Sequence, residues 1–62
     1  MNERPSAKKL AEILRQIQLG KELTLQKFQK DRSAEWIARY EEEINACYWA
    51  AIGYDKLAER EG

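Results

Sequence analysis

The chain has 62 residues, enough for a single domain near the lower size limit for folding without disulfides or bound metals. Hydrophobic residues make up 44% of it and charged residues 35%, a balance typical of a folded helical protein, which excludes a disordered one. Eleven Lys and Arg offset eleven Asp and Glu, and the single cysteine and absent histidine exclude an internal disulfide and a Cys–His catalytic pair.

A first helix is predicted over about residues 6–30. Ser6 is a suitable N-cap, and Pro5 before it keeps the helix from starting earlier. The apolar residues that follow have the i, i+3, i+4, i+7 spacing of one face of an amphipathic helix: Leu10, Ile13, Leu14 and Ile17.

Gly20 leaves two alternatives open. The helix could end there, with Thr24 capping a short additional helix, which would give three helices in all. Alternatively, the helix continues through Gly20 at a cost of about 1 kcal/mol relative to alanine. The heptad spacing from Leu10 to Phe28 runs straight through the glycine and favours the continuous helix.

Residues 31–33 are predicted to form a turn, in which Ser33 or Asp31 caps a long second helix of about residues 34–60. A connection of three residues makes the two helices antiparallel neighbours. The second helix carries one apolar stripe: Trp36, Ile37, Tyr40, Ile44, Cys47, Tyr48, Ala51, Tyr54 and Ala58. Cys47 is expected to be a small buried core residue.

Closing the hairpin at residue 32 brings together residues whose numbers sum to about 64. This register pairs Lys21, the one charge in the seam of the first helix, with the acidic Glu43. It also predicts the following neighbours: Leu10 with Tyr54, Leu14 with Ala50 and Ala51, Ile17 with Cys47, Gly20 with Ile44, Thr24 with Tyr40, and Phe28 with Trp36.

The predicted fold is all-α, a single helical domain of residues 1–62 built as an antiparallel helical hairpin. The middle of the second helix is apolar nearly all round, and one partner helix covers only one side of it. We therefore expect a homodimer in which two hairpins form a four-helix bundle.

Trp49 and Ile52 project from the flank and back of the second helix, away from its apolar stripe. With Leu19 and Leu23 of the first helix, they are expected to supply a second, partner-binding surface. Tryptophan is favoured at binding hot spots, so this surface would serve either the dimer seam or the groove of a foreign protein.

The outer side of the first helix is basic and is the candidate nucleic-acid face, with Lys8, Arg15, Lys27 and Lys30. An ordinary solvated cationic face, interrupted by Glu12 and Glu22, is the alternative. Leu23-Thr24-Leu25, the cysteine of the second helix, and the glycine and aspartate near its end resemble the plasmid copy-number regulators of the Rop family. That resemblance implies a dimeric four-helix bundle that binds RNA hairpins.

Duplex DNA is not an expected partner. Residues 23–28 and 36–41 are similar to a helix-turn-helix, but the spacing between them is short, and Glu41, Glu42 and Glu43 would repel phosphates. These three glutamates also point in three directions on a helix, and bundle diiron sites need histidine. We expect no catalytic, cofactor-binding or metal-binding residues and no enzyme activity.

The sequence therefore favours a small non-enzymatic modulator or adaptor that acts by protein–protein contact. The alternatives are an RNA-binding helical-bundle regulator that uses the basic face, and an engineered helical binder or scaffold. A cytoplasmic location without membrane contact is expected, because no signal peptide is visible and the uncharged run of residues 46–54 is too short to span a bilayer.

Overall fold

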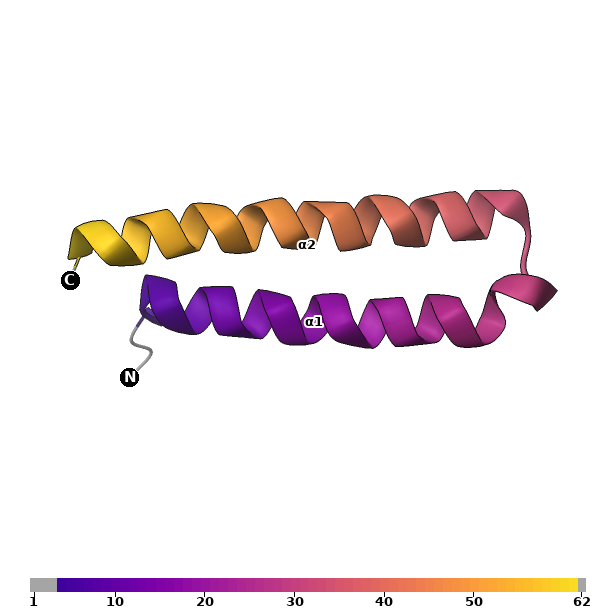
Figure 1. Ribbon diagram of the computed structural model, residues 1–62, viewed down its shortest axis with the longest axis horizontal. Helices are drawn as coiled ribbons and strands as arrows, with labels where there is room; N and C mark the ends of the chain where they lie inside the picture. Colours follow the sequence, from indigo (N-terminus) through magenta and orange to yellow (C-terminus); the bar gives the residue numbers. More distant parts are fainter. Residues whose placement is uncertain (1–3, 62) are drawn as a thin grey trace.

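A computed structural model of the chain describes residues 4–61 and consists of two antiparallel helices joined by a tight turn (Figure 1). Helix α1 spans Ala7–Phe28, the 3₁₀-helix η1 spans Gln29–Asp31, and helix α2 spans Ala34–Glu61. No strand occurs in the part of the chain that the structure describes. The predicted domain also included residues 1–3 and 62, which lie outside the described residues.

Helix α1 begins at its predicted cap and runs through Gly20 without a break. The Ser6 Oγ accepts a hydrogen bond from the Lys9 backbone N–H at 3.1 Å, which satisfies one of the free donors at the start of the helix. No glycine of residues 4–61 has a positive φ, so Gly20 is an ordinary helical residue and the three-helix alternative is wrong. The α-helix ends at Phe28, two residues before the predicted end, and its last turn tightens into η1.

Helix α2 is capped by Ser33, one of the two predicted caps. The Ser33 Oγ accepts a hydrogen bond from the Trp36 backbone N–H at 3.2 Å. Asp31 is the last residue of η1 instead. Glu35 lies in the first turn of α2, where a carboxylate interacts favourably with the positive end of the helix dipole.

The predicted register is confirmed at Lys21, whose Nζ lies 2.9 Å from Glu43 Oε1. At the turn, the Arg32 guanidinium lies 5.7 Å from the Phe28 ring and 5.5 Å from the Trp36 ring, so it links this predicted pair. The pairing of Gly20 with Ile44 is wrong. A methyl group on Gly20 would have no neighbour within 4 Å, because Lys21 occupies the side of α1 that faces α2.

The hairpin has no large buried side chain in its described part. Only Ala7, Ala11 and Ala51 are buried, and the larger residues of the apolar stripe are half-buried or exposed. Cys47, which was expected to be buried, is half-buried. The reason is the shape of the molecule, which measures 44 × 25 × 15 Å and is therefore one helix thick. Each large side chain has neighbours on only part of its surface.

Candidate interaction surfaces

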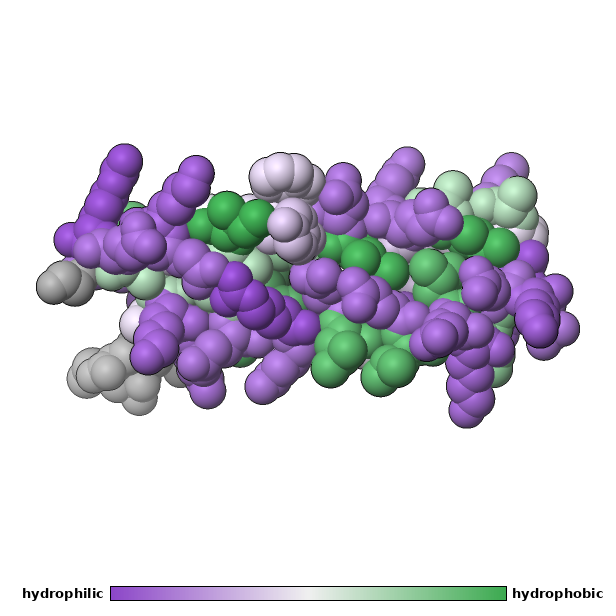
Figure 2. Space-filling view, in the orientation of Figure 1, coloured by the Kyte–Doolittle hydropathy of each residue, from purple (hydrophilic) through white to green (hydrophobic). Residues whose placement is uncertain are grey.

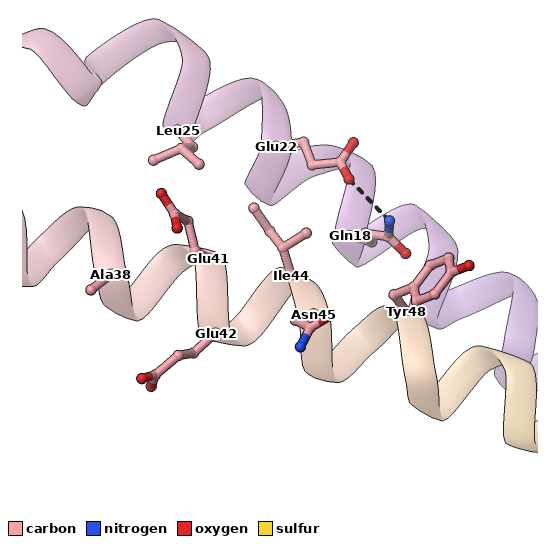
Figure 3. Close-up of a pocket in the computed structure, with 9 residues that line it drawn as sticks. All are labelled: Gln18, Glu22, Leu25, Ala38, Glu41, Glu42, Ile44, Asn45 and Tyr48. Carbon is pink, nitrogen blue, oxygen red and sulfur yellow. Dashed lines mark hydrogen bonds between the residues drawn. The ribbon is translucent and has the colours of Figure 1, made fainter.

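Two broad faces and two long edges make up the surface of this flat hairpin. Figure 2 shows hydrophilic (purple) and hydrophobic (green) side chains intermingled on the molecular surface. One broad face, called here the polar face, contains a shallow groove between α1 and α2. Its lining mixes polar and apolar residues: Gln18, Glu22, Leu25, Ala38, Glu41, Glu42, Ile44, Asn45 and Tyr48. In Figure 3, Ile44 points toward α1 and the Tyr48 ring lies near Gln18, whereas Glu42 points away from the groove. Gln18 donates a hydrogen bond to Glu22 at 3.0 Å.

An ion pair between Arg15 and Asp55 closes one end of the polar face. The two terminal nitrogens of Arg15 each donate to one oxygen of Asp55, so the contact is bidentate. These hydrogen bonds lower the pKa of Asp55 below its ordinary value and raise the pKa of Arg15. Both side chains stay about half exposed, so the pair contributes little to the stability of the fold.

A second ion pair lies within the seam between the helices. Lys21 donates to Glu43, and its Nζ also lies 5.3 Å from the centre of the Tyr40 ring. The hydrogen bond to Glu43 is the main reason that the pKa of Lys21 is raised. The middle of the seam is therefore polar, and it contributes less apolar burial than a leucine pair would.

The opposite broad face is called here the apolar face. Helix α1 contributes four of its residues and α2 contributes four, each set with the spacing i, i+4, i+7, i+11: Ile13, Ile17, Gly20 and Thr24, then Ala46, Ala50, Gly53 and Leu57. None of them is charged. The largest three remain 37% (Ile13), 43% (Ile17) and 44% (Leu57) exposed.

The two faces are opposite because of their positions along each helix. Ile13 precedes Arg15 by two residues, and Gly53 precedes Asp55 by two residues. Two residues correspond to about 200° of rotation, so each member of these pairs lies on the other side of its helix. The same relation holds for Ala46 and Tyr48. Ile13 and Ile17 were expected to pack inside the hairpin, and they instead border it.

The predicted partner-binding residues do not form one surface. Trp49 is 61% exposed on the outer edge of α2, about 160° round the helix from the buried Ala51. Leu19 and Leu23 are each 57% exposed, about 140° and 180° round α1 from the inward Leu14, and so lie on the other edge of the hairpin. Ile52 is half-buried and follows Tyr48 by one turn, beside the polar face.

The predicted basic face is also divided. Lys8 and Arg15 share one side of α1, but the charge of Arg15 is paired with Asp55. Lys27 lies about a third of a turn away from Arg15, with its Nζ 5.4 Å from the Phe28 ring. Lys30 belongs to η1. These four residues therefore do not form a continuous cationic strip.

Sequence reasoning missed the apolar face. Its signal was present in the uncharged i, i+4, i+7, i+11 repeats of both helices. Ile17 was assigned to the pair with Cys47, and Ala50 to the pair with Leu14. Ala46 and Gly53 were taken only as part of one uncharged run. Arg15 was assigned to the basic face, and its contact with Asp55 had no signal in the heptad spacing.

Across residues 4–61, no three Cys, Asp or Glu side chains come together in a way that could ligate a metal ion. Neither α1 nor α2 combines the length and the apolar character that crossing a bilayer would require. Comparisons with protein-family models, with curated proteins and with solved structures find no match to this chain.

Proposed function

We propose that this chain is a small non-enzymatic interaction protein, a modulator or adaptor that works as a homodimeric four-helix bundle and binds another protein. The observation that carries the proposal is the absence of any large, fully buried side chain in the described part of the hairpin. A domain normally buries its apolar residues between two packed layers, and this hairpin is a single layer. A second copy would supply the other layer.

Trp49 supports contact with a further protein. Within residues 4–61 its indole is the most exposed of the large apolar side chains, and it lies on the outer edge of α2, one turn before Gly53 of the apolar face. The Tyr48 ring meets it edge-on, with the two ring centres 5.3 Å apart. An exposed indole is well suited to enter a pocket on a partner, where tryptophan often dominates the binding energy.

A pull-down from host-cell lysate tests this proposal, with the tagged chain as bait and the protein it retains as the captured protein. Tagged wild type would be compared with Trp49→Ala and with Leu23→Ala, which removes an apolar side chain of similar exposure from the other edge. We expect Trp49→Ala to keep its helix content and dimer mass but to bind the captured protein roughly thirtyfold more weakly, as for a hot-spot residue. Leu23→Ala should bind like wild type.

Two controls separate this proposal from its alternatives. Nuclease treatment and raised salt should leave the captured protein bound, whereas an RNA ligand would be lost under both conditions. Sedimentation of the purified wild type at micromolar concentration should give twice the 7.3 kDa chain mass. Unchanged binding by Trp49→Ala, or capture of RNA alone, would contradict the proposed role of the α2 edge.

A further inference from the structure

The hairpin exposes more surface than a compact protein of its mass. Its accessible area is 5350 Å², whereas the scaling law for compact monomers gives about 4,200 Å² for 7.3 kDa, an excess of roughly 1,200 Å². Covering that excess on each of two copies would bury roughly 2,400 Å² in total, which is in the range of permanent homodimers. The missing layer is therefore about the size of one more hairpin.

Gly20 and Gly53 indicate which broad face that layer covers. Both lie inside helices, where only proline is less favourable than glycine. Neither has a positive φ, and a methyl group on either would meet nothing within 4 Å, so the hairpin itself does not require glycine at these positions. Both belong to the apolar face, where a missing side chain lets another backbone approach closely.

The apolar face can also be buried without leaving an unpaired polar group. The Thr24 hydroxyl, its one polar side-chain group, donates to the Gly20 carbonyl oxygen at 2.9 Å. Covering the apolar face would also remove the Lys21–Glu43 pair from water, but those two charges stay paired at 2.9 Å. On the polar face, Glu22 and Glu41 belong to no ion pair within residues 4–61, so covering that face would remove unpaired charges from water. This difference favours the apolar face as the side that another chain covers.

The distribution of large and small side chains makes the apolar face complementary in shape to the same face of a second copy. Helix α1 presents the large Ile13 and Ile17, while α2 presents the small Ala46, Ala50 and Gly53. A two-fold axis parallel to the helices lays α1 of one copy over α2 of the other, so that large side chains fill the shallow strip opposite. We infer that two copies associate through the apolar face, an inference that rests on the proposed function.

The test is a pair of matched substitutions in α2. Ala50→Lys places a charge on the apolar face, and Ala38→Lys places the same charge beside the polar groove; both alanines are exposed in the hairpin. We expect Ala50→Lys to weaken the dimer by at least about a hundredfold, because an unpaired lysine would be desolvated in the seam. Ala38→Lys should stay within about threefold of wild type by sedimentation equilibrium.

The outcomes distinguish this inference from the proposed function. If both lysine variants dimerise like wild type, or if Ala38→Lys alone is weakened, the dimer exists but its seam is elsewhere, and the inference is overturned while the function stands. If wild type remains monomeric at all micromolar concentrations, the proposed homodimer fails and the inference fails with it.

A second pair of variants covers the case in which Ala50→Lys does not fold. Ile17→Gln lies on the apolar face and Leu23→Gln on the outer edge of α1, and both replace an exposed aliphatic residue with a good helix former. A dimer weakened at least tenfold by Ile17→Gln and not by Leu23→Gln supports the inference. Equal effects of the two substitutions overturn it.

Discussion

Arg15 and Asp55 form the most directional contact between the helices, because both terminal nitrogens of the guanidinium donate to the same carboxylate. The residue numbers of this pair sum to 70, whereas the predicted register pairs residues whose numbers sum to about 64. An arginine side chain is long and can reach residues more than a turn away along the neighbouring helix. The backbone register therefore does not determine which carboxylate it pairs with. Lys21 and Glu43, by contrast, lie on the facing stripes of both helices, where spacing alone was sufficient to pair them.

The Arg15–Asp55 pair gives a prediction about pH. Because the pKa of Asp55 is lowered in the folded state, its contribution to stability is complete above the unfolded-state value of 3.8 and is lost as the pH falls through the lower, folded value. Asp55→Asn should therefore lower the Tm near neutral pH, and its difference from wild type should disappear in acid.

Thermal melts from pH 7 to pH 2 measure this difference. Glu59→Gln is the control, because it removes a carboxylate from the same helix without touching Arg15. A gap between wild type and Asp55→Asn that stays constant down to pH 2 would show that the substitution acts through something other than the ion pair.

At the scale of the elements, the helices could be predicted because each local signal agreed with the others. Ser6 and Ser33 are both capping residues, and the structure uses both. The heptad spacing through Gly20 correctly outweighed the glycine itself. The end of α1 was placed two residues late, because nothing in Gln29 or Lys30 opposes an α-helix and the reversal of the chain tightens those residues into η1.

The cap of α2 gives a prediction at this scale. Ser33→Ala removes the acceptor for the Trp36 N–H and should lower the free energy of unfolding by about 1 kcal/mol. Ser33→Asp keeps an acceptor in place and adds a favourable charge at the start of the helix, so it should match or exceed wild type. Chemical denaturation compares the three proteins, and equal losses in the two variants would mean that the cap has no energetic role.

The arrangement of the whole molecule shows why sequence alone could not place the candidate partner-binding residues. Helical periodicity placed Trp49, Leu19 and Leu23 away from the apolar stripes, but only the arrangement of the two helices reveals that they lie on opposite edges. The apolar face consists mainly of alanine, glycine and the two isoleucines, residues that an isolated pattern assigns equally well to the inside of a hairpin.

Thermal stability should depend on protein concentration if two hairpins share one core. Binding of a second copy stabilises only the folded state, so the Tm of wild type should rise with each tenfold increase in concentration. Calorimetry or circular dichroism from about 1 to 100 µM would follow this shift. A Tm that is constant over that range, with a cooperative transition, would contradict dimerisation.

The two tryptophans occupy different environments, so each is a natural optical reporter of a different event. Trp36 is half-buried at the turn, stacks on Tyr40 with ring centres 4.3 Å apart, and lies beside the Arg32 guanidinium. Trp49 is largely in solvent. Fluorescence from a Trp49→Phe protein therefore follows closure of the hairpin, whereas fluorescence from a Trp36→Phe protein follows whatever approaches the outer edge of α2. Closure of the hairpin and any contact made at the outer edge of α2 can thus be timed separately without attaching a dye.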